Sequence, residues 1–239
     1  FLFDVTHLPF PAAGQEAHVL QTLKSYLEQH GEQTAAFVFE PIVQGAAGMR
    51  AYAPKTLRAM VELCRAHGVL LIADEVMTGF GRIGSMFACE KANVIPDLMC
   101  LSKGLTGGFL PMGATLATKD IYKAFYKDDK AQQFFHSTSF TGNPMACAAA
   151  LASLEIWEEE PVGQSLKMIE AAHRKAAGWF VARRDVMDVR VIGTIFALDI
   201  ADEVEGYLSS IGTEIYDFMI ANDILLRPIG NTVYILPPY

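Results

Sequence analysis

Residues 69–75 read Val-Leu-Leu-Ile-Ala-Asp-Glu, and residues 97–104 read Asp-Leu-Met-Cys-Leu-Ser-Lys-Gly. Each stretch holds a short apolar run bounded by Gly or Pro, a pattern typical of strands that are buried on both faces of a parallel sheet. Asp74 follows the first run and Lys103 follows the second. Ligands of open α/β sheets bind at the carboxyl edge of the strands, so the pattern predicts that an acid and an amine meet there.

The pair of Asp74 and Lys103 has the chemistry that pyridoxal phosphate needs. A lysine amine forms an imine with a carbonyl carbon, and a carboxylate keeps a pyridine nitrogen protonated so that the ring accepts electrons. On spacing alone, an ordinary acid at a strand end and a solvated surface lysine are an equally good interpretation.

The residues before Asp74 predict a βαβ unit. Residues 35–39 are apolar and end at Glu40, and Pro54 opens a helical pattern over 54–67 that Gly68 ends. Crossovers between parallel strands are right-handed, so Glu40 is expected at the same sheet edge as Asp74.

The pattern changes near residue 158, and we expect two domains, 1–158 and 159–239. The acidic and Pro-containing residues 158–163 mark the boundary. Further elements of a smaller α+β unit follow. Helices are predicted over 165–184 and 209–222, and strands over 189–192, 195–198, 224–226 and 233–235.

Composition excludes several classes of protein. The 239 residues are 51% hydrophobic and carry a net charge of -8 without a basic stripe, which argues against nucleic acid or an anionic membrane as a partner. The four cysteines contain no C-x-x-C pair, so neither a metal site nor a disulfide framework is expected. We expect a cytoplasmic enzyme with reduced thiols that acts on small molecules.

Four segments together resemble one family. Residues 40–49, 71–82, 102–108 and 136–144 are similar, in the same order, to the class III, fold-type I aminotransferases. The resemblance implies an α/β fold, with a mostly parallel sheet flanked by helices and a smaller α+β C-terminal domain. The chain starts without Met and stops at Tyr239, so we expect it to lack the family's N-terminal part and a last C-terminal segment.

The resemblance also implies roles for individual residues. Lys103 would form the Schiff base with pyridoxal phosphate and then shuttle a proton, in a low-dielectric pocket that favours its neutral form. Asp74 would pair with the pyridine nitrogen, and Val76 would pack on the ring. Met77 stands where some relatives have a glutamine that bonds the cofactor's phenolic oxygen. Ser139 replaces a threonine that reaches the phosphate of the neighbouring subunit's cofactor, which implies a homodimer with shared active sites.

The C-terminal residues imply a substrate. Arg227 resembles the arginine that holds the carboxylate of 8-amino-7-oxononanoate, as a bidentate donor can, and Tyr234 and Gly104 would line the same site. The expected reaction transfers an amino group from S-adenosylmethionine to give 7,8-diaminononanoate in biotin synthesis.

Other interpretations stay open at this point. The hydroxyls of residues 136–141 precede a helix and could bind a phosphate or merely cap that helix. Another class III enzyme that uses ω-amino acids or diamines shares the same cofactor residues, and a non-catalytic protein could keep the fold. A nucleotide site over 104–108 is disfavoured because the G-x-x-x-x-G-K-[ST] order is missing.

Overall fold

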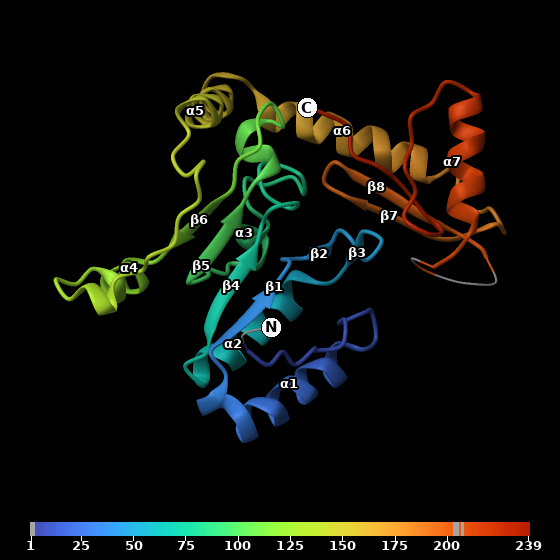
Figure 1. Ribbon diagram of the computed structural model, residues 1–239. Helices are drawn as coiled ribbons and strands as arrows, with labels where there is room; N and C mark the ends of the chain where they lie inside the picture. The colour runs from blue at the N-terminus through green and yellow to red at the C-terminus, as the bar shows by residue number, and fades with distance from the viewer. Residues whose placement is uncertain (1–2, 203–205, 207) are drawn as a thin grey trace.

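The computed structural model describes residues 3–202, 206 and 208–239. Its larger sheet has the order β1-β4-β5-β6 (Figure 1). The first three strands are parallel and β6 is antiparallel to β5, so the expected mostly parallel sheet is confirmed. The strands span β1 Ala36–Phe39, β4 Leu70–Asp74, β5 Leu98–Leu101 and β6 Ala114–Ala117.

One face of the larger sheet is covered by this chain. Leu71 and Ala73 of β4 are fully buried, whereas Leu70 is 37% exposed and Val38 of β1 is 63% exposed. The expectation of strands buried on both faces is therefore wrong for the described residues, because they cover fully only one face of β4.

The helix predicted over 54–67 begins and ends close to the predicted residues. α2 starts at Pro54, as predicted, and buries one apolar face against α1 and the sheet. Asn143 caps α5 by accepting hydrogen bonds from the backbone N–H groups of Met145 and Ala146. The helices of this part are α1 Glu16–His30, α2 Pro54–Ala66, α3 Ala88–Ala92, α4 Lys119–Phe125 and α5 Pro144–Glu159.

The C-terminal residues build a second, antiparallel sheet in the order β7-β8-β9, with α6 packed against it (Figure 1). A small hairpin, β2–β3, extends from the larger sheet toward this unit. The remaining elements are β2 Val43–Gln44, β3 Arg50–Ala51, α6 Val162–Ala177, β7 Val186–Ile192, β8 Ile195–Ile200, α7 Ile211–Ala221 and β9 Thr232–Ile235.

Two predicted elements of this part differ in the structure. The helix expected over 165–184 forms with other bounds: it begins at Val162, directly after Pro161, and ends at Ala177 before Gly178, because glycine commonly stops a helix. The strand expected over 224–226 does not form. Both edges of β8 are already paired with β7 and β9, and Leu225 is 85% exposed.

No helix among the described residues is long and apolar enough to cross a membrane. The four cysteines are free thiols.

Candidate active site

The parallel strands deliver charged residues to one edge of the larger sheet. Phe39 of β1 pairs with Ala73 of β4, so Glu40 and Asp74 emerge side by side. Lys103 follows β5, the next strand. These three residues line one cavity of about 1130 Å³. The predicted meeting of an acid and an amine at the carboxyl edge is therefore confirmed.

The carboxylate of Asp74 is held by the backbone that follows it. Its Oδ1 accepts a hydrogen bond of 3.0 Å from the N–H group of Val76. Val76 and Met77 also line the cavity. The other carboxylate oxygen accepts no hydrogen bond from the described residues, so it is available to a group in the cavity.

Lys103 adopts an unusual backbone conformation. Its φ angle is +47°, in the left-handed region that side chains other than glycine rarely adopt, and strain of this kind concentrates at functional sites. Lys103 begins a 3₁₀ helix, Lys103–Thr106, that packs on α5. Gly104 permits the close packing behind it, since an added Cβ would lie 2.7 Å from the Cβ of Phe80.

Lys103 is exposed in this chain. The low-dielectric pocket expected around its amine is therefore not formed by the described residues, which leave the Lys103 side chain exposed as a whole.

Glu40 is a third charged group in the cavity. Its Oε2 accepts a hydrogen bond of 2.9 Å from the N–H group of Gly45. Burial raises the pKa of Glu40 above its ordinary value; the Gly45 bond opposes this rise, the nearby Asp74 carboxylate adds to it and Lys103 opposes it. The cavity thus holds a carboxyl group that resists ionisation.

The opposite wall of the cavity comes from the C-terminal part of the chain. Arg227, Tyr234 and the residues 228–230 line it, and Gly104 lines the near side. Within the described part of the chain, no carboxylate forms an ion pair with Arg227. A free guanidinium can bind a carboxylate in bidentate geometry.

Ser139 lies outside this cavity. It sits in an exposed segment before α5, beside a second, largely apolar groove of about 1510 Å³ that His136, Thr138 and Phe140 help to line. The described chain therefore brings together six of the seven predicted site residues and leaves Ser139 apart.

The sequence interpretation assigned no role to Arg82, which also lines the cavity. Its guanidinium donates to the hydroxyl of Thr194 at 3.0 Å and to the carbonyl of Pro237 at 2.9 Å, and it lies 5.1 Å from the ring centre of Tyr239. Burial lowers the pKa of Arg82, while Tyr239 opposes that effect. The only feature of the sequence that pointed to this segment was the set of Gly residues around Arg82, and it did not predict which residues Arg82 would contact.

Comparisons with known proteins identify the family. The family model for class-III aminotransferases matches residues 1–239, which is the whole chain. The chain belongs to the class-III aminotransferase family.

Individual class-III relatives cover the chain almost completely. The adenosylmethionine-8-amino-7-oxononanoate aminotransferase of Synechococcus elongatus is 43% identical, over 100% of this chain and 57% of its own length. The crystal structure of the enzyme of the same name from Methanocaldococcus jannaschii matches with a TM-score of 0.90 and 34% identity, over 99% of this chain and 56% of that one. The chain thus spans little more than half the length of these relatives.

An enzyme with a different name is also similar. An amine transaminase from an uncultivated Pseudomonas species, described as PLP-bound, matches with a TM-score of 0.85 and 34% identity, over 95% of this chain and 52% of that one.

Class-III aminotransferases depend on pyridoxal phosphate, and the donor set of the cavity fits two parts of that molecule. Asp74 offers a free carboxylate oxygen for the ring nitrogen, and Lys103 offers an amine for the carbonyl carbon. The hydroxyl-rich residues 137–139 lie outside this cavity.

Proposed function

We propose that the full-length protein transfers an amino group from S-adenosylmethionine to 8-amino-7-oxononanoate, giving 7,8-diaminononanoate in biotin synthesis. The observation that carries the proposal is that Arg227 lines the same cavity as Asp74 and Lys103. A cation opposite the reactive amine suits a substrate whose carboxylate lies at a distance from the carbon that reacts. The shared name of the two relatives above supports this substrate.

Asp74 and Val76 would hold the cofactor ring. The Asp74 carboxylate would keep the ring nitrogen protonated, and the hydrogen bond from Val76 N–H orients that carboxylate. Val76 would pack on the ring face. When bound, pyridoxal phosphate supplies an electron sink for the carbon that loses its proton.

Lys103 would bind the cofactor and then move the proton. Its amine would accept the proton from the substrate carbon and return it to the cofactor, which requires the neutral form of the amine. The 3₁₀ helix packed on α5, with the Ser153 hydroxyl bonded to the Gly104 carbonyl at 3.2 Å, holds the backbone of Lys103 in place.

The second half of the site would bind the substrate tail. Arg227 would take the carboxylate, and Tyr234 and Gly104 would contact the chain between the carboxylate and the reacting carbon. A planar guanidinium recognises a carboxylate by its geometry as well as by its charge.

We also propose a homodimer with shared active sites, in which Ser139 reaches the phosphate of the partner subunit's cofactor. The position of Ser139 outside its own cavity, beside an exposed apolar groove, supports this arrangement, because large apolar patches mark interfaces.

Two further assignments belong to the proposal. They are the division into a cofactor-binding domain, 1–158, and a small domain, 159–239, and a cytoplasmic location, where the free thiols would stay reduced.

A second candidate is an amine transaminase with a different substrate. The Pseudomonas enzyme is as similar in sequence, 34%, as the M. jannaschii enzyme. Substrate choice therefore depends on the cavity wall that holds Arg227, since the cofactor residues are common to the family.

Arg227→Ala in the full-length protein distinguishes the two candidates. We expect the catalytic efficiency (kcat/KM) with 8-amino-7-oxononanoate to fall roughly 30- to 1000-fold, as befits loss of a partly desolvated charge pair of ~2–4 kcal/mol. The half-reaction with S-adenosylmethionine should change much less. Equal losses in both half-reactions, or retained activity with the amino ketone, would remove Arg227 from the carboxylate site.

A further inference from the structure

Arg190 of β7 connects two parts of the chain that are far apart in sequence. Its side chain is 11% exposed. The guanidinium donates two hydrogen bonds of 2.7 Å to the two carboxylate oxygens of Asp199 and one of 2.8 Å to the carbonyl oxygen of Gly48. A fourth, of 2.5 Å, goes to Asp188, whose side chain is 56% exposed.

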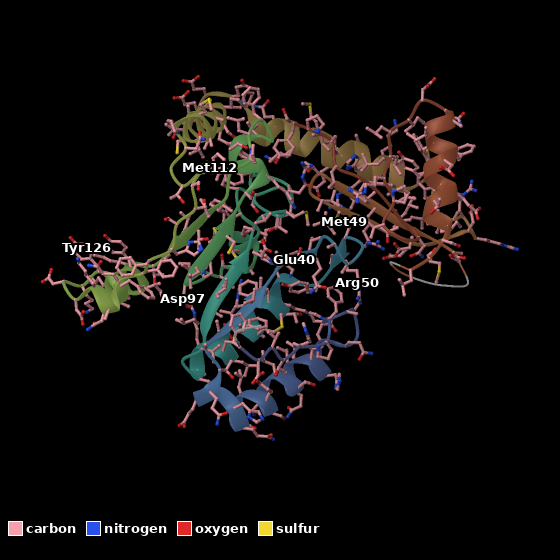
Figure 2. The ribbon with its side chains drawn as sticks, viewed as in Figure 1. Glu40, Met49, Arg50, Asp97, Met112 and Tyr126 are labelled. Atoms are coloured by element: carbon pink, nitrogen blue, oxygen red, sulfur yellow. The ribbon has the colours of Figure 1, made fainter. Side chains whose placement is uncertain are left out.

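Gly48 belongs to the tip of the β2–β3 hairpin, residues 45–49, and this tip forms part of the cavity wall. Gly45, Ala46 and Met49 line the cavity, and Figure 2 shows Met49 on the part of the hairpin that extends toward β7. Gly48 has a φ angle of +91°, and a Cβ built on it would lie 2.9 Å from the hydroxyl oxygen of Thr232. The hairpin tip is thus packed directly against β9.

Asp199 connects Arg190 to the turn that carries Arg227. Asp199 of β8 lies opposite Thr232 of β9, and the Thr232 hydroxyl donates to it at 2.7 Å. Thr232 exchanges two backbone hydrogen bonds of 2.9 Å with Ile229. Residues 227–230 line the cavity, so an unbroken set of hydrogen bonds joins one cavity wall to the other.

We propose that Arg190, Asp199, Thr232 and the Gly48 carbonyl form a clamp that sets the distance between the cofactor end of the cavity and Arg227, and thereby selects the length of the carboxylate-bearing substrate. The inference rests on the proposed function, in which Arg227 binds that carboxylate. The clamp residues are positioning residues, since they act through the hairpin tip and the Arg227 turn.

The chemistry of the clamp suits a rigid link. A guanidinium is a planar donor that can serve the Asp199 carboxylate and the Gly48 carbonyl at once, whereas a lysine ammonium is a flexible point charge. Partial burial keeps water from replacing these bonds. The clamp therefore resists a change in the spacing of the two walls.

Two variants of the full-length holoenzyme test the clamp through different bonds. Thr232→Val keeps the side-chain shape and removes only the hydrogen bond to Asp199. Arg190→Lys keeps the positive charge but loses the planar guanidinium that donates to two acceptors at once. We expect each to raise KM for 8-amino-7-oxononanoate roughly 5- to 20-fold, the equivalent of about one or two hydrogen bonds, with kcat changed less than about twofold. KM for the methyl ester of the same amino ketone, which lacks the carboxylate charge, should stay at its parent value in both variants.

The controls come from the same residues. Thr232→Ser keeps the hydroxyl and should retain the parent KM. Asp188→Ala removes the acceptor of the one Arg190 hydrogen bond that reaches neither cavity wall, and it should also leave KM unchanged. Because the two test variants act on different bonds, either one decides the question if the other does not fold.

The outcomes separate the clamp from the proposed function. Arg227→Ala is measured alongside, and a parent-like KM in that protein overturns the carboxylate site and the clamp with it. A raised KM in Arg227→Ala combined with parent-like KM in both clamp variants overturns the clamp alone. Equal KM changes for acid and ester, or a fall in kcat alone, also overturn it, because a general structural defect would not distinguish the carboxylate.

Discussion

Two adjacent carboxylates, Asp74 and Glu75, have opposite environments. Asp74 faces the cavity, while Glu75 is fully buried, as expected where successive side chains point to opposite faces. Glu75 accepts hydrogen bonds of 2.5 Å from the Thr78 hydroxyl, 3.0 Å from Ala88 N–H and 2.8 Å from Cys89 N–H. It thereby holds the turn after Asp74 against the start of α3.

Glu75→Gln should destabilise the protein. Gln keeps one acceptor oxygen but turns an N–H₂ group toward donors, leaving a buried donor unsatisfied at a cost of about 1–3 kcal/mol. Urea unfolding measures the loss. Glu90→Gln, the same change at an exposed residue of α3, should stay within about 0.5 kcal/mol of the parent; an equal loss in both proteins would contradict the role of Glu75.

Glu40 gives stability a pH dependence. Its pKa is raised in the folded chain, chiefly by burial, from an ordinary value of 4.5. As the pH rises, Glu40 therefore loses its proton at a lower pH in the unfolded chain than in the folded chain. The contribution of this group to the free energy of unfolding is complete below the ordinary pKa and is lost as the pH rises through the raised pKa of the folded chain.

Glu40→Gln stays neutral and can still accept the Gly45 hydrogen bond. The variant should therefore melt at a higher temperature than the parent at neutral pH. The difference should shrink as the pH falls below 4.5, which thermal melts at a series of pH values would measure. A difference that is constant across pH would show that the carboxyl group has no such titration.

At the scale of elements, the turn between β7 and β8 joins the small sheet to the segment that contains Arg82. The buried Thr194 donates its N–H to the Arg82 carbonyl at 3.0 Å. Gly193 has a φ angle of +55°, and a Cβ built on it would lie 2.3 Å from the carbonyl carbon of Ile83. The backbones of the two units touch here, and only glycine permits that approach.

Gly193→Ala tests this contact. Left-handed strain and overpacking together should cost about 2–5 kcal/mol in the free energy of unfolding. Gly107 is the matched control, because its φ angle of +61° is similar and a Cβ there would meet nothing within 4 Å. Gly107→Ala should therefore cost only the strain, about 1–2 kcal/mol; losses of the same size in denaturant unfolding would mean that the turn can move away.

At the scale of the whole molecule, one group of exposed apolar side chains lines the second groove. Phe134, Phe140 and Met145 line it and are 65%, 80% and 68% exposed. In Figure 2 this region extends along the α4 side, where Tyr126 is labelled, away from the small sheet. Such a patch fits the proposed subunit interface.

Phe140→Asp in the full-length protein should weaken the proposed dimer. A charge at the centre of an apolar interface costs about 2 kcal/mol or more, which raises the dimer dissociation constant roughly 30-fold. Light scattering after size-exclusion chromatography measures the change over a dilution series. Val181→Asp, at a residue 74% exposed after α6, should leave the dimer intact; an unchanged Phe140→Asp protein would place the interface elsewhere.

The sequence by itself determined the parallel strands, the helix from Pro54 and the meeting of Glu40, Asp74 and Lys103, because apolar runs and Gly or Pro stops are local signals and parallel strands share an edge. Only the tertiary structure decided which residues Arg190 and Arg82 contact. Their hydrogen bonds join residues 142 and 155 positions apart in sequence, to Gly48 and Pro237. No local pattern encodes such a partner, since it depends on how segments far apart in the sequence pack against each other.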